Sequence, residues 1–365
     1  MNKLSAAVAL VVCGISVNAF AGARVVVNGV MPGSVPAQDQ GIRSLNSTSA
    51  PSPLKKILFQ KVVLSADAQD YLASHISDPD SSNTLLAAPA NGVSSQQIAM
   101  NNVPVLDQGQ HGSCATFATT AALDAVLGKK DYISQLCNLE LGSYLESKDS
   151  NYPSGWEGST NEIVLTQIKD NGIIKKADQL STGCRFDNKP EQYNLTDQSE
   201  TGLPVTKALF VAHSEMVMSS ISYVPLFNPD DAFSNQVNMT NVLNNKVKPA
   251  INKGHRIVFG TLIDEKIGGN GLGGSYKARN DTWALTSLIQ KHAKNKNNIH
   301  AGHAMVITGY DDNAVMTDTD GKKHTGILTL RNSWSAQYGD QGNYYMTYDY
   351  FKKMVTEAEE IVPSA

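Results

Sequence analysis

The stretch DQGQHGSCATFATTAALDAVLG, residues 107–128, joins a turn containing two glycines to an alanine-rich run. Ser113 is a residue type that caps helix N-termini, and Gly128 is the type that most often follows a helix C-terminus. The stretch therefore predicts a helix over residues 113–127 with Cys114 in its first turn. The positive end of a helix dipole stabilises a thiolate and lowers the pKa of the thiol, as a nucleophilic cysteine requires. On these residues alone, a buried structural cysteine is the alternative.

The N-terminus has the pattern of a secretory signal peptide. Lys3 is followed by an apolar segment over residues 4–17 and by Ala19-Phe20-Ala21, a small-x-small cleavage pattern. The apolar run is shorter than the roughly 20 residues that cross a bilayer. We therefore expect residues 1–21 to be removed, the protein to be periplasmic or secreted, and no stable membrane insertion.

Composition limits the classes of partner. The chain has 365 residues, of which 41% are hydrophobic, and a net charge of −4. It has no long run of Lys or Arg, so nucleic acid and anionic membranes are not expected partners. No spacing of Cys, His or carboxylates indicates a metal site, and no cofactor is expected.

The cysteine count indicates one free thiol. Once Cys13 leaves with the signal peptide, Cys114, Cys137 and Cys184 remain, which is an odd number in an exported chain. An oxidising compartment favours a bridge between two of the three. The count alone does not say which two.

Two regions of different amino-acid composition follow the expected signal peptide. Residues 22–95 are rich in Ser, Ala, Pro and Asn and predict a small accessory unit that ends in an exposed linker. Its expected elements are strands over residues 23–30 and 55–64, a helix over 65–76 and the linker over 77–95.

Residues 96–365 read as a mixed α and β domain in which helices come first and strands last. This order predicts an α+β fold, with a helical half and a β-rich half that share a cleft. The expected helices are residues 113–127, 160–170 and 282–294, and the expected strands are 256–263, 304–311, 326–333 and 343–348.

Three motifs in this order resemble those of the papain-like cysteine peptidases. The first comprises Gln108, Gly109, Gly112, Ser113, Cys114 and Phe117. The second is AGHAMVITGYDD, residues 301–312, and the third is LRNSWSAQYGDQGNYYM, residues 330–346. The resemblance covers roughly residues 96–360 and implies a papain-like fold of two subdomains, a helical half and a β-barrel-like half, with the active-site cleft between them.

The resemblance also implies a catalytic set. His303, expected just before a strand, would form a thiolate and imidazolium pair with Cys114. Asn332 would accept a hydrogen bond from the other ring nitrogen, and Trp334 would shield that bond. The side-chain amide of Gln108 and the backbone N–H of Cys114 would bind the oxyanion. The remaining histidines, including His300 and His111, are expected to be exposed or loop residues.

Further assignments rest on the same resemblance. It implies a Cys137–Cys184 disulfide, with Cys114 free, and it assigns Gly158 and Trp334 to substrate binding, Gly158 through its backbone. The chain departs from the family at two positions. His111 stands where a disulfide cysteine is usual, and Ala115 stands where an aromatic is usual.

The expected protein is an exported cysteine endopeptidase that acts on protein or peptide substrates through a Cys114 acyl-enzyme. Residues 22–95 are expected to be a prodomain that blocks the cleft until the linker is cut. Two alternatives stay open: an amidase or transferase of the same fold acting on a non-protein or specialised substrate, and a catalytically silent binding protein.

Overall fold

A computed structural model describes residues 23–36, 54–78, 92–197, 201–265, 272–296 and 299–364. The predicted signal peptide and most of the predicted linker lie outside these ranges. All statements below concern the described residues.

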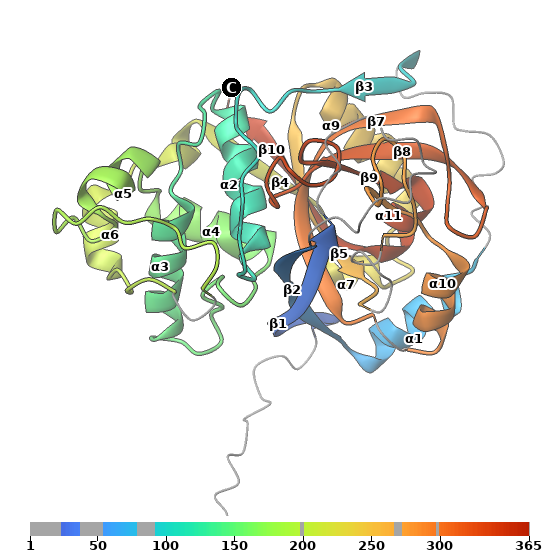
Figure 1. The fold of residues 1–365 in the computed structure, drawn as a ribbon, viewed down its shortest axis with the longest axis horizontal. Coiled ribbons are helices and arrows are strands. Elements are labelled where there is room, and N and C mark those ends of the chain that lie inside the picture. The colour runs from blue at the N-terminus through green and yellow to red at the C-terminus, as the bar shows by residue number, and fades with distance from the viewer. Residues whose placement is uncertain are drawn as a thin grey trace, which may run out of the picture.

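One large sheet dominates the right half of Figure 1. Its central strands pair in the order β4-β10-β5-β7-β8-β9-β6, and β2 and β3 add to β7. Every residue of β5 is buried, as expected for a strand covered on both faces. The strands are β1 Val25–Pro36, β2 Leu54–Leu64, β3 Ser95–Gln97, β4 Ile221–Phe227, β5 Arg256–Ile263, β6 Thr282–Trp283, β7 Ala301–Thr317, β8 Lys323–Arg331, β9 Asn343–Thr347 and β10 Val355–Pro363.

The helices α2 to α6 form the left half of Figure 1, and α2 packs against the sheet strands β5, β7 and β10. This arrangement confirms the predicted α+β class with a helical and a β-rich half. The helices are α1 Ala66–His75, α2 Cys114–Val126, α3 Gln135–Glu146, α4 Asn161–Asn171, α5 Lys176–Thr182, α6 Lys207–His213, α7 Pro229–Ala232, α8 Met239–Val242, α9 Lys248–Asn252, α10 Ser287–Lys294 and α11 Tyr348–Met354, with short η segments at Val217–Ser219 and Leu243–Val247.

The N-terminal strands are part of the main sheet. β1 and β2 form an antiparallel hairpin, and β2 pairs with β7 through Gln60 opposite Gly302 and Lys61 opposite Ala301. Figure 1 shows the dark-blue hairpin between α2 and the sheet. The prediction of a small N-terminal unit did not include this pairing, because β2 finds its partner in a strand that lies more than two hundred residues later in the chain.

The hairpin and α1 also share the core of the sheet. One continuous cluster of buried side chains joins them to the sheet strands. Burial of each large apolar side chain stabilises by about 1.5–3 kcal/mol, so many side chains hold the N-terminal unit in place. Its members in that cluster are Val35, Ile57, Phe59, Val62, Leu64, Ala68, Leu72 and Ile76.

Some predicted boundaries differ from the structure. The expected helix over 282–294 begins only at Ser287, with Thr286 as its N-cap, because Thr282 and Trp283 pair with β9. His303 lies inside β7, not just before a strand, because pairing with β5 and β2 extends β7 back to Ala301. A hairpin joins β7 to β8.

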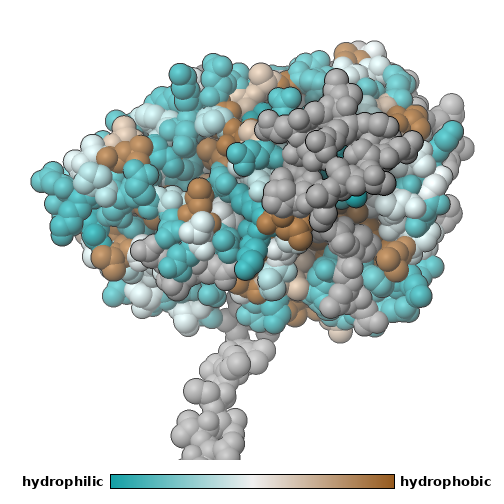
Figure 2. Space-filling view, viewed as in Figure 1, coloured by the Kyte–Doolittle hydropathy of each residue, from teal (hydrophilic) through white to brown (hydrophobic). Residues whose placement is uncertain are grey.

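The face shown in Figure 2 has mixed polarity. Brown hydrophobic residues form small groups among teal hydrophilic ones, as on most water-exposed protein surfaces. Among the helices described, none has the length and apolar character needed to cross a bilayer.

Candidate active site

Cys114 is the first residue of α2, and its side chain is fully buried. Its Sγ lies 4.0 Å from the carbonyl oxygen of Gly112. The backbone of Ala304 lies close enough to the sulfur to lower the pKa of the thiol. Since Ala304 follows His303 in β7, the first turn of α2 meets the sheet beside the predicted base.

Ser113 occupies the N-cap position of α2 but does not cap it with its side chain. Its Oγ instead forms a hydrogen bond of 2.9 Å with Oη of Tyr193. The free N–H groups of this helix end are therefore not occupied by the serine hydroxyl that precedes the cysteine.

His303 is held as the resemblance implies. Its Nε2–H donates to Oδ1 of Asn332 over 2.8 Å, and its Nδ1 has no hydrogen-bond partner among the described residues. The imidazole stacks on the indole of Trp334, with ring centroids 4.6 Å apart. Trp334 is only 1% exposed. It therefore shields the histidine in this state, and its predicted contact with substrate is not available.

Gln108 is bonded through both its backbone and its side chain. Its backbone N–H donates to the carbonyl oxygen of Ser333 over 2.9 Å, and its Oε1 accepts from Oγ of Ser333 over 2.8 Å. Its Nε2 donates to the carbonyl oxygen of His111 over 3.0 Å. Because an amide nitrogen carries two hydrogens, one donor remains for an oxyanion.

Burial sets the protonation of the reacting pair. It raises the pKa of the Cys114 thiol to about 12, despite backbone hydrogen bonds from Ala304, Ala115 and Cys114 itself that lower it. Burial also lowers the pKa of His303 to about 4, and the Asn332 hydrogen bond only partly opposes this. Both shifts favour the neutral groups in this covered state, and the thiolate and imidazolium pair stays a prediction for the uncovered site.

The β1–β2 hairpin covers the site and touches both of its sides. On the sheet side, the ring of Phe59 lies edge-on to His303 with centroids 6.0 Å apart. On the helical side, Nε2 of Gln60 donates to the carbonyl oxygen of Ser159 over 2.6 Å. A Cβ added to Gly158 would lie 2.5 Å from Cγ1 of Val27. The backbone of Gly158 thus faces the hairpin at the place where substrate binding was predicted.

Two further contacts place the hairpin over the nucleophile turn. A Cβ added to Gly112 would lie 2.3 Å from Cγ1 of Val30, so the hairpin packs directly on this glycine. Lys55 forms a partly buried ion pair with Asp107 and donates to the carbonyl oxygen of Trp334 over 3.2 Å. The ion pair joins the hairpin to the residue just before Gln108.

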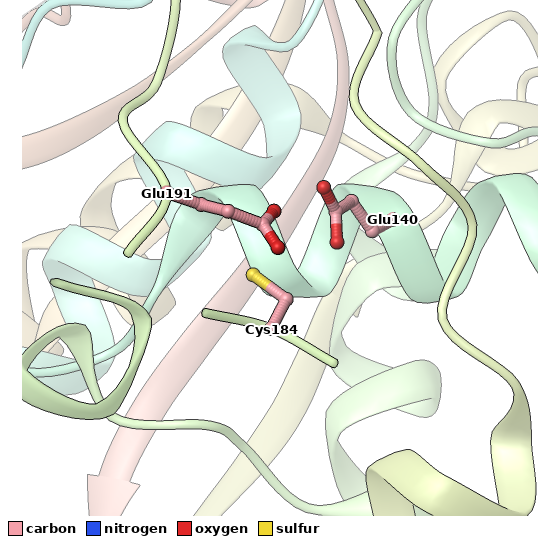
Figure 3. Close-up of side chains that lie close together, drawn as sticks. All are labelled: Glu140, Cys184 and Glu191. Carbon is pink, nitrogen blue, oxygen red and sulfur yellow. The ribbon is translucent and has the colours of Figure 1, made fainter. Parts of the chain in front are cut away.

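Cys137 and Cys184 form a disulfide in the structure, and Cys114 is a free cysteine. Among the described residues, one group has the proximity of metal ligands: atoms of Glu140, Cys184 and Glu191 lie within 4.8 Å of one another (Figure 3). Because the Cys184 sulfur is already bonded to another sulfur, it is a poor ligand, and the absence of a cofactor stays a prediction.

Sequence reasoning missed three residues of the site. Ser333 could have been found, because it lies between Asn332 and Trp334 in a quoted motif. Phe59 and Tyr193 had no motif around them, and only tertiary packing brings them to the site. His111 was expected to be a simple loop residue but is 2% exposed, since it packs against neighbouring aromatic rings.

Comparisons with known proteins point to cysteine proteinases. No protein-family model matches the chain. Cysteine proteinase 1 of Entamoeba histolytica is 34% identical over 91 residues, which are 24% of this chain and 29% of that protein. Digestive cysteine proteinase 2 of Homarus americanus is 29% identical over 147 residues, which are 34% of this chain and 45% of that protein. The chain thus spans less than half of the length of the curated relatives it matches.

The chain is less similar in sequence to proteins of solved structure. Xylellain, a cysteine protease from Xylella fastidiosa, has a TM-score of 0.48 and 16% identity, covering 75% of this chain and 87% of that one. The clostridial cysteine protease Cwp84 has a TM-score of 0.46 and 15% identity, covering 72% and 56%. Digestive procathepsin L 3 of Tenebrio molitor has a TM-score of 0.38 and 15% identity, covering 81% and 79%.

Proposed function

We propose that this protein is an exported cysteine endopeptidase of papain-like type, made as a zymogen. One observation carries the proposal. Nε2 of His303 is bonded to Asn332, and Nδ1 of His303 has no hydrogen-bond partner among the described residues. The next residue, Ala304, lies with its backbone beside the Cys114 sulfur. A free thiol, an oriented imidazole and an amide donor are the groups that acyl transfer needs. The similar cysteine proteinases support the same reaction class.

The reaction would begin once the site is uncovered. Water then restores the ordinary pKa values, and the Cys114 proton passes to Nδ1 of His303. Sγ attacks the amide carbon, and the oxyanion is bound by Gln108 and the Cys114 N–H. The C–N bond breaks as His303 protonates the leaving amine. Water, deprotonated by His303, then hydrolyses the thioester.

The zymogen part of the proposal is supported by the hairpin. Phe59 and Gln60 occupy the space beside His303 and Ser159, where an extended substrate would bind. Protonation supports the same reading, because a buried neutral thiol is a poor nucleophile. Export is proposed from the signal-peptide pattern.

The test is covalent labelling by a peptidyl epoxide, followed by intact mass. Two samples are compared: the full chain and a cut chain. The cut chain carries a protease site inserted within residues 79–91, which is cleaved before the sample is diluted. We expect slow labelling of the full chain and fast labelling of the cut chain at Cys114 alone. Cys114→Ala and His303→Ala in the cut chain should abolish it.

Three outcomes would contradict the proposal. A folded cut chain that is not labelled, and that cleaves no unfolded protein, would favour the silent binding protein. Equal labelling of the full and cut chains would show that the hairpin does not inhibit. Labelling with hydrolysis of small amides but not of proteins would favour the amidase.

A further inference from the structure

Residues 184–195 form a strap that crosses the nucleophile turn, residues 107–113. Oη of Tyr193 donates to the carbonyl oxygen of Gln108 over 2.9 Å, and Oγ of Ser113 lies 2.9 Å from the same Oη. One phenol thus bonds the turn on both sides of its two glycines. Ser113 is the residue before Cys114, whose backbone N–H is a predicted oxyanion donor.

The strap also bonds the residues between these two anchor points. Nε2 of His111 lies 2.8 Å from the carbonyl oxygen of Asn194. The backbone N–H of Gln110 donates to the carbonyl oxygen of Leu195 over 2.9 Å. A Cβ added to Gly109 would lie 2.4 Å from the Leu195 oxygen, so only glycine allows this close approach.

An aromatic cluster fixes the orientation of the phenol. The Tyr193 ring stacks on Trp156 at 5.7 Å with an interplanar angle of 6°, and it meets His111 and Phe117 edge-on at 5.4 and 5.1 Å. Such pairs are directional. Burial raises the pKa of Tyr193 above its ordinary value, so its hydroxyl stays a donor at neutral pH.

The far end of the strap is attached to α3. The disulfide joins Cys184 to Cys137, and Figure 3 shows the carboxyl groups of Glu191 and Glu140 directed toward each other beside that sulfur. Burial, and then the hydrogen bond and charge of Glu191, raise the pKa of Glu140 to about 9. The disulfide therefore gives the strap a fixed base on the helical half.

We propose that Tyr193 is a positioning residue for the oxyanion-binding groups, held in place by the strap. Its hydroxyl sets the backbone of the turn between Gln108 and Ser113, and so the direction of the Gln108 amide and the Cys114 N–H. The inference rests on the proposed function, since it assigns a role within that reaction.

The test compares Tyr193→Phe with wild type in the cut chain, which keeps all of its polypeptide. The phenylalanine keeps the ring packing and removes only the hydroxyl. We expect kcat for a peptide amide to fall about tenfold with KM unchanged, because a misplaced oxyanion donor costs transition-state binding. Affinity for a peptide aldehyde, whose adduct with the thiol carries an oxyanion, should fall by about the same factor.

Two variants separate positioning from folding. Tyr152→Phe removes a comparable hydroxyl, which bonds Gln167 over 3.0 Å in the same half, and should change neither quantity. Ser113→Ala should reproduce part of the Tyr193→Phe effect, and the two should not add. The urea midpoint of each variant shows whether it is folded.

Three outcomes are distinguishable. If wild type is not labelled by the epoxide, the proposed function fails. If wild type is labelled, and folded Tyr193→Phe keeps kcat and aldehyde affinity within twofold, the positioning role is overturned. A rise in KM alone would also overturn it, because that would indicate substrate contact instead of an oxyanion effect.

Discussion

At the scale of single residues, the chemistry of Cys114 depends on what covers it. A helix N-terminus favours a thiolate by about 0.3–1 kcal/mol when exposed, and the sequence prediction relied on this effect. In the structure, burial dominates and the pKa of Cys114 rises to about 12. The residues of the candidate site could be located because short motifs carry them. Their burial could not, because Phe59 reaches His303 from a distant segment.

The buried imidazole gives a pH dependence. Because His303 has a folded-state pKa of about 4, against about 6.5 when exposed, the unfolded chain binds more protons between these values. The stability that this group contributes is fully present above about pH 6.5 and is lost as pH falls toward about 4. We expect the free energy of unfolding, from urea titration, to be lower at pH 5 than at pH 7.

The matched variant for this pH effect is His303→Gln, which cannot titrate in that range. Its difference in unfolding free energy between pH 7 and pH 5 should be smaller than that of wild type. An equal difference in the two proteins would mean that carboxyl groups, and not the histidine, cause the acid sensitivity.

At the scale of elements, the strands of the hairpin were predictable but their partner was not. The runs of β-branched and other apolar residues over 23–30 and 55–64 indicate strands, and both strands exist. Local pattern carries no information on which edge a strand joins, and here β2 joins β7. The same reason explains residues 282–283, where pairing with β9 overrides a helical pattern.

One ion pair is expected to act as a latch for the hairpin. The side chains of Lys55 and Asp107 are 14% and 26% exposed, and hydrogen bonds to charged groups contribute about 1.5–3 kcal/mol. Lys55→Met should therefore increase epoxide labelling of the uncut full chain at least tenfold, as measured by intact mass over time.

The control is Lys296→Met. This lysine pairs with Asp70 of α1 in the same N-terminal unit, but the two side chains are 43% and 66% exposed, and such pairs contribute little. Labelling should stay near the wild-type rate. If both variants label like wild type, the ion pair is not what holds the hairpin closed.

At the scale of the whole molecule, the disulfide closes a long loop within the helical half. Its cysteines are 47 residues apart in sequence, and loop-closure entropy predicts a contribution of about 4 kcal/mol for such a loop. The double variant Cys137→Ser, Cys184→Ser should lower the free energy of unfolding by up to this amount in urea titration. A loss below 1 kcal/mol would indicate that packing alone holds α3 and the strap together.

The overall division into two halves followed from the order of helices and strands, whereas the way the halves are bridged did not. Gln60 of the hairpin bonds Ser159 of the helical half, and Tyr193 bonds Gln108 and Ser113, in each case between segments that are remote in sequence. No local pattern marks such residues. They are found only when the fold has brought the segments together.

The core that the hairpin shares with the sheet changes what a cut in the linker would mean. In the proposed zymogen, the inhibitory unit is tethered before the cut, and its effective concentration does not depend on how much protein is present. After the cut, the N-terminal unit is a separate ligand with its own dissociation constant. The active fraction of a cut sample should then rise on dilution and fall when the free unit is added back, so that enzyme concentration itself becomes a regulator.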